Sequence, residues 1–276
     1  MALFTREPIA AGSFYPSNGA KLREMVDESF PKRPYTVRKG FLNGLIAPHA
    51  GYIYSGKTAG KVYYELSKYL PRTFVILGPN HTGMGDDISI MYNASYKTPL
   101  GTVNTDTNIG RDLCKSLRLT NDFLAHSKEH SIEVQLPFLQ FLYAEKLKIL
   151  PIVIGDLTLE QLKELGSELA KLDATIIASS DFTHHGDVYG YTPFSNPVLE
   201  LRDFDMKAVN LIEKLDVNTF HELGAKSTIC GYKPITVLMQ AMKERGASPH
   251  FLDYSTSADI TKDYKNVVSY ASISFK

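Results

Sequence analysis

Three histidines and one cysteine carry reactive side chains near the ends of apolar or glycine-bearing segments: His49, His81, His184 and Cys230. The segments that precede the histidines have the composition of short buried strands, and they comprise residues 44–48, 73–80 and 174–181. In an open α/β sheet the carboxyl ends of the strands border one crevice, so side chains that follow different strands can converge there. Two imidazoles and a thiolate that converge at this edge would form a metal site.

The sequence around Cys230 favours a thiol that takes part in chemistry. Cys230 lies in a polar, glycine-bearing segment at residues 226–234, just before a helix-like run at residues 235–242. A helix N-terminus lowers the pKa of a nearby thiol and so favours the thiolate that binds metals. The other cysteine, Cys114, shares one helical face with apolar neighbours, and we expect it in the core.

His49 and His81 stand in similar settings. Each has a proline within the two preceding residues and a glycine two residues later. A proline fixes the backbone and a glycine permits a tight loop, so each imidazole would leave its strand in a defined direction. A single histidine of this kind would more often only cap a turn, but the repeated pattern favours a functional role for both.

A carboxylate, Asp181, lies three residues before His184. It is a candidate partner for the second ring nitrogen of His184, which could then act as a metal ligand or as a general base. The alternative is that Asp181 caps a helical turn and that His184 and His185 both face the solvent. The sequence leaves both interpretations open.

His126 and His130 have the i, i+4 spacing of a helical metal-binding pair. The residues between them do not form the His-Glu-x-x-His motif of zinc proteases. The spacing alone indicates a solvated start of a helix, with Ser131 and Glu133 serving its N-terminus.

Strands and helices alternate along the chain, which predicts an α/β fold. Helices are expected at residues 18–30, 58–69, 108–117, 131–143 and 158–172, the fourth interrupted at Pro137 and the fifth capped by Thr158. Further strands are expected at residues 88–92, 149–154 and 266–275, the last at or near a sheet edge, and a turn-rich stretch at residues 93–107. We therefore predict a single α/β domain over residues 1–276, with a central, mostly parallel or mixed sheet flanked by helices.

Composition argues against several functional classes. The 276 residues are 43% hydrophobic, and 30 Lys plus Arg balance 30 Asp plus Glu, so no basic surface for nucleic acid is expected. The first residues lack a signal-peptide pattern, no apolar run approaches the ~18 residues that span a bilayer, and two cysteines suit a reducing compartment, so we expect a cytoplasmic protein without membrane contact. Dinucleotide-binding, Walker and Gly-x-Ser-x-Gly motifs are absent, which disfavours nucleotide enzymes and serine hydrolases.

Six short motifs, in this order, resemble those of the Memo family, named for a mediator of cell motility and found also in archaea and bacteria. They are AGSFYP at residues 11–16, APHAGY at 47–52, GPNH at 78–81, EHSIE at 129–133, SSDFTH at 179–184 and ICG at 229–231. The motifs span nearly the whole chain. Each alone is a weak signal, but together they are highly specific.

The resemblance implies the fold of the catalytic subunit of class III extradiol dioxygenases, which hold non-haem Fe(II) with two histidines and a carboxylate. By that analogy His49, His81 and Cys230 match the metal positions, and His184 with Asp181 matches the rest of the pocket, where the dioxygenases keep a histidine as acid/base. The carboxylate position of the dioxygenases is occupied here by Cys230. A thiolate is softer and extends the metal preference to copper and zinc as well as iron, so ring cleavage is not expected.

The resemblance also implies further pocket residues and partners. It makes Glu129 and His130 pocket residues, against the interpretation from spacing alone. Independently of the resemblance, we expect Tyr52 or Tyr54 to line the same pocket. Bacterial and archaeal members are associated with a radical-SAM protein, which implies a pathway partner of that class. Some animal members bind phosphotyrosine-bearing peptides.

Three functions are compatible with the sequence. The first is a metal-binding, redox-linked protein of oxidoreductase type, with iron or copper on His49, His81 and Cys230, a small molecule or peptide as substrate, and His184 oriented by Asp181 to move protons. The second is a non-catalytic module that binds a peptide or protein through the same cleft. The third is a zinc-dependent hydrolase, because two histidines and a cysteine with one open position also describe catalytic zinc sites.

Overall fold

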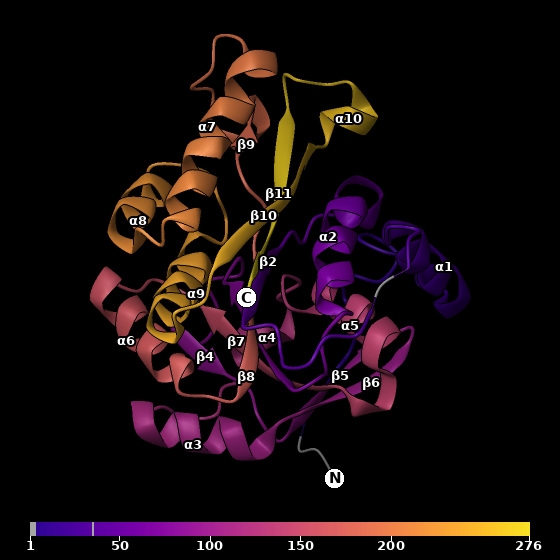
Figure 1. The fold of residues 1–276 in the computed structure, drawn as a ribbon, viewed down its shortest axis with the longest axis vertical. Helices are drawn as coiled ribbons and strands as arrows, with labels where there is room; N and C mark the ends of the chain where they lie inside the picture. The colour runs from indigo at the N-terminus through magenta and orange to yellow at the C-terminus, as the bar shows by residue number, and fades with distance from the viewer. Residues whose placement is uncertain (1–3, 35) are drawn as a thin grey trace.

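The computed structural model describes residues 4–34 and 36–276, in which strands and helices alternate (Figure 1). The strands are β1 (Phe4–Arg6), β2 (Gly44–Ala47), β3 (Thr73–Pro79), β4 (Ile88–Ile90), β5 (Ala94–Thr98), β6 (Gly101–Thr105), β7 (Lys148–Ile154), β8 (Ala174–Ser179), β9 (His184–His185), β10 (Pro249–Thr256) and β11 (Val267–Phe275). The α-helices are α1 (Gly19–Ser29), α2 (Tyr52–Leu66), α3 (Thr107–Leu117), α4 (Leu124–Ser127), α5 (Leu136–Tyr143), α6 (Leu159–Ala170), α7 (Pro197–Glu213), α8 (Val217–Ala225), α9 (Tyr232–Arg245) and α10 (Ala258–Thr261). The short 3₁₀ turns are η1 (Glu133–Gln135), η2 (Ala144–Lys146) and η3 (Asp187–Tyr189). Within these described ranges, no helix is both long and apolar enough to cross a membrane.

A mixed sheet runs through the molecule in the order β1-β5-β6-β7-β3-β8-β2-β11-β10, with β4 paired to β7 and β9 to β11. Neighbouring strands from β6 to β2 are parallel, whereas β11 is antiparallel to both β2 and β10. The predicted α/β fold with a mixed central sheet flanked by helices is therefore confirmed. The last strand, β11, lies one place in from the edge, because β10, which we did not predict, pairs outside it.

Helices cover both faces of the sheet because the central strands are apolar on both sides (Figure 1). In β3, Phe74 and Ile76 join the core under α1, α2 and α5, whereas Val75 and Leu77 join the core under α6 and α9. Successive strand residues point to opposite faces, so one strand supplies both cores. Because the strands from β6 to β2 are parallel, their carboxyl ends lie on the same side of the sheet, and the loops that follow them meet there.

Several boundaries differ from the sequence predictions. Helix α2 begins at Tyr52 rather than near residue 58, and the stretch predicted as turn-rich, residues 93–107, contains the antiparallel pair β5 and β6. The predicted interruption at Pro137 is a helix start, because proline at the first turn of α5 costs no hydrogen bond. The predicted cap is confirmed, since the Thr158 side chain accepts from the backbone N–H of Gln161.

Candidate metal centre

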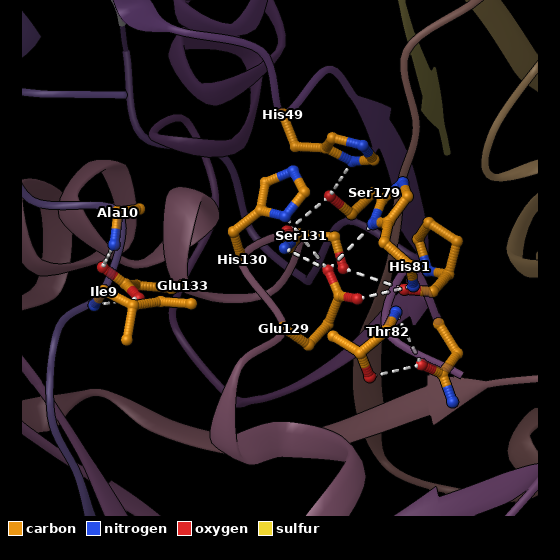
Figure 2. Close-up of polar contacts among 12 residues, drawn as sticks. Ile9, Ala10, His49, His81, Thr82, Glu129, His130, Ser131, Glu133 and Ser179 are labelled. Atoms are coloured by element: carbon orange, nitrogen blue, oxygen red, sulfur yellow. Dashed lines mark hydrogen bonds and ion pairs between the residues drawn. The ribbon is translucent and has the colours of Figure 1, made fainter. Parts of the chain in front are cut away.

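The imidazoles of His49, His81 and His130 meet beyond the carboxyl ends of the parallel strands (Figure 2). His49 follows β2, His81 follows β3, and His130 lies between α4 and η1. One donor nitrogen from each ring lies within 4.8 Å of the others, and the ring centroids are 4.8–5.4 Å apart. Three imidazole nitrogens that lie together beyond the carboxyl ends of these strands are a donor set that suits a transition metal.

Outer hydrogen bonds fix two of these rings. The Nδ1 atom of His49 lies 2.9 Å from the Ser179 hydroxyl, and Nδ1 of His81 lies 3.0 Å from a carboxylate oxygen of Glu129 (Figure 2). Glu129 also accepts from the backbone N–H of His81 at 2.7 Å, so it holds both the loop and the ring. A carboxylate partner on one ring nitrogen is the usual support of a metal-binding histidine, because it leaves the other nitrogen free.

The charges of this group suit a metal-binding site. Burial lowers the pKa of His49 well below its usual range, and the neighbouring imidazoles lower it further. Burial also lowers the pKa of His130 to about 4, although Glu129 opposes that shift. Burial alone would raise the pKa of Glu129, but the hydrogen bond and charge of His81, together with the backbone N–H of Ser131 and the charge of His130, outweigh it and lower that pKa to about 2. Neutral imidazoles at His49 and His130, beside the ionised carboxylate of Glu129, are in the protonation states that metal binding requires.

Cys230 lies beside this group. Its Sγ atom is 3.2 Å from Nε2 of His49 and 3.7 Å from the backbone oxygen of Asp181. Among the described residues, the group whose donor atoms all lie within 4.8 Å of one another contains the three histidines and not Cys230. Helix α9 does begin two residues later, but burial and the charge of Asp181 raise the pKa of the thiol. The predicted lowering of this pKa is therefore wrong.

His184 and Asp181 lie in the same cleft but are not bonded as expected. Nδ1 of His184 lies 3.0 Å from the backbone oxygens of both Phe182 and Thr228. Asp181 instead accepts from the backbone N–H groups of His49 and Ala50, at 2.8 and 3.1 Å. Asp181 therefore holds the loop that carries His49, and two carbonyl groups, rather than Asp181, orient the ring of His184.

A cavity of about 490 Å³ opens over the three histidines and is also lined by Asp181, His184 and Tyr54. A second cavity of about 400 Å³ adjoins it and is lined by His81, His184 and Cys230. Tyr52, the alternative to Tyr54, is buried under the cleft, and its hydroxyl donates to the backbone oxygen of Val134 at 2.6 Å. Of the two tyrosines considered, the structure therefore brings only Tyr54 to the cavity.

The interpretation of His126 and His130 as a solvated pair is wrong. Helix α4 ends at Ser127, so the two residues do not share one helix. His126 is buried, with its ring nitrogens 2.9 Å from the hydroxyl of Tyr96 and 3.0 Å from the backbone oxygen of Ser89. His130 instead points toward His49 and His81.

Sequence reasoning missed a buried ion pair behind the centre. Arg6 and Glu133 are 1% and 0% exposed and form a direct ion pair. Arg6 also donates to the backbone oxygens of His126 and Glu129, at 3.0 and 2.5 Å. The available signal was the charge of Glu133 next to a mostly apolar stretch, residues 134–139, because a carboxylate buried in such a stretch needs a partner.

Comparison with known proteins agrees with these motifs. Residues 6–274 match the family model described as Memo-like protein. Proteins described as MEMO1 family proteins from Nitrosopumilus maritimus and Desulfurococcus amylolyticus are 37% and 38% identical to this chain, over 98% of it and 99% and 98% of their own lengths. One from Methanosarcina acetivorans is 38% identical over 97% of this chain and 98% of its own. A match over nearly the whole length, with the motif residues gathered in one cleft, leads to one conclusion: the chain belongs to the Memo family.

Proposed function

We propose that this protein binds a redox-active transition metal in the cleft and carries out metal-dependent oxidoreductase chemistry on a small molecule or peptide. The observation that supports it most strongly is the group of three imidazoles, His49, His81 and His130, with Ser179 and Glu129 on outer ring nitrogens. This arrangement has both the inner donors and the outer hydrogen bonds of a metal site.

The nature of the donors favours iron or copper. Imidazole nitrogen binds iron, copper and zinc, and a thiolate adds preference for softer ions. Cys230 lies 3.2 Å from His49, so it is placed to join the donor set once its proton is lost. Such a metal supplies Lewis acidity and electron transfer to the cleft when it is bound.

His184 is the residue that we propose moves protons. Two backbone carbonyls face its Nδ1 atom, and carbonyl oxygens only accept hydrogen bonds. Nδ1 therefore carries the proton, which leaves Nε2 as an acceptor for a proton from a ligand in the cavity. Tyr189 packs edge-on against this ring, with centroids 5.3 Å apart, and restricts its rotation.

The test is metal analysis of protein purified without oxygen and without a metal-affinity tag. We expect about one iron or copper ion per wild-type chain, and loss of that ion in His130→Ala. Comparison with Cys230→Ala tests whether the thiolate is a ligand, because loss of a ligand should lower metal content as far as His130→Ala does. Absence of any metal from the wild-type protein would contradict the proposal and favour the peptide-binding module, whose partner affinity would not respond to chelators.

A zinc-dependent hydrolase is the second candidate, and the three-imidazole group is the observation that favours it. Three histidines with an open position describe a common catalytic zinc site, in which bound water is acidified. That function requires tight zinc and no redox activity. Stoichiometric zinc in the anaerobic preparation, with turnover unaffected by reductants, would replace the first proposal.

The outer carboxylate gives a prediction of its own. Glu129→Gln removes the charge that holds His81 but keeps the size of the side chain, so we expect metal affinity to fall about 10- to 100-fold. Competition with a chromophoric chelator measures this change. An affinity within about twofold of wild type would mean that Glu129 only stabilises the loop.

A further inference from the structure

We infer that Ser179 is a positioning residue that fixes the proton of His49 on Nδ1 and thereby keeps Nε2 open toward the cleft. The inference rests on the proposed metal site for its purpose but on hydrogen-bond directions for its evidence. Ser179 ends β8, is 0% exposed, and contacts His49, Ser131 and Gln135 through its single hydroxyl. Each of these contacts has a direction that can be derived from chemistry.

The hydroxyl of Ser179 donates its one proton to the backbone oxygen of Ser131. Its Oγ atom lies 2.6 Å from the backbone oxygen of Ser131, and a carbonyl oxygen can only accept. The hydroxyl proton therefore points to Ser131. Both lone pairs of Ser179 remain, and they can only accept hydrogen bonds from the other two neighbours.

The amide of Gln135 supplies the first of these donors. Its Nε2 atom lies 3.0 Å from the backbone oxygen of Pro48, so the NH₂ group, and not the amide oxygen, must face that side. The same NH₂ donates to Ser179 at 2.8 Å, and the amide oxygen accepts from the Tyr63 hydroxyl at 2.7 Å. The backbone carbonyls of Pro48 and Ser131 thus fix the direction of the hydrogen bonds that Gln135 and Ser179 make.

His49 must therefore be the second donor to Ser179. Its Nδ1 atom, 2.9 Å away, carries the proton, and Nε2 carries a lone pair. The contact on the opposite side of the ring is compatible with this tautomer. The Cys230 Sγ atom lies 3.2 Å from Nε2 and 3.7 Å from the backbone oxygen of Asp181, so its one S–H can donate to the Nε2 lone pair, the nearer acceptor. The nitrogen nearest Cys230 is consequently the one available to a metal.

Nitrogen-15 NMR of metal-free protein labelled at histidine tests this inference, because the two ring nitrogens report protonation separately. We expect His49, assigned by its absence in His49→Gln, to have a protonated Nδ1 and an unprotonated Nε2. Ser179→Ala removes the acceptor, so we expect a mixed or reversed tautomer and about 10- to 100-fold weaker Co²⁺ binding. Gln135→Met leaves the Ser179 hydroxyl between Ser131 and His49, and it should keep the wild-type tautomer.

Ser272→Ala is the matched control. Ser272 is equally buried, and within the described part of the chain its hydroxyl has no hydrogen-bond partner, so its loss should change neither tautomer nor Co²⁺ affinity. A wild-type His49 protonated on Nε2, or a Ser179→Ala protein with the wild-type tautomer and affinity, would overturn the inference. The expected tautomer in a protein that binds no Co²⁺ would support the inference while overturning the proposed metal function.

Discussion

His49→Ala is expected to abolish stoichiometric metal binding, with an affinity loss on the order of 100-fold or more. His49 belongs to the three-imidazole group and also lies beside Cys230, so either choice of donors includes it. Within the part of the chain that the structure describes, removing it leaves only two members, His81 and His130, of the three-imidazole group. The metal content of dialysed protein measures the effect directly.

His250→Ala is the control for this substitution, because His250 is exposed on β10 and should keep its full metal content. Circular dichroism should show that the His49→Ala fold is intact. The double variant of His49→Ala and Cys230→Ala is the strictest case. Stoichiometric metal retained by the folded double variant would refute the assignment of the site.

Arg6→Ala is expected to lower the free energy of unfolding by about 3–5 kcal/mol. The substitution leaves the carboxylate of Glu133 buried without its counter-charge, although the backbone N–H groups of Ile9 and Ala10 still donate to it at 3.0 Å. It also removes the donors to the backbone of the segment that carries His130. Denaturant unfolding followed by circular dichroism measures the loss.

Loss of an exposed ion pair is the comparison for the stability cost of Arg6→Ala. Lys32 and Asp27 are 64% and 56% exposed, so Lys32→Ala should change stability by less than about 1 kcal/mol. Replacing Arg6 and Glu133 together with Met and Gln should recover part of the loss, because no unpaired charge remains. A cost below about 1 kcal/mol for Arg6→Ala would show that water reaches Glu133 and that the pair is not structural.

The strands that deliver His49 and His81 were predictable, because continuous apolar runs bounded by proline and glycine are local signals. The mixed sheet follows from the same alternation, and membership of the Memo family carries the dioxygenase-like fold with it. The hairpin of β5 and β6 was not predictable from periodicity. Its strands are short and polar, and they are held by pairing with each other and with β1.

The donors and their supports were predictable only in part. Spacing could not show that α4 ends before His130, so that His126 and His130 point in different directions. Nor could it show that Asp181 binds the backbone of the His49 loop, since that contact joins residues 132 positions apart. Local patterns indicate which residues can react, whereas the tertiary packing decides which of them meet.

His49 and Cys230 are separated by 181 positions, and His81 and His130 reach the cleft from two other loops. An unfolded chain cannot bring these side chains together, so an ion that binds here binds only the completed fold. Metal at 100 times its dissociation constant would add about 2.7 kcal/mol to the free energy of unfolding. Substitutions that destabilise the sheet far from the cleft should therefore be tolerated better when the site is occupied than when it is empty.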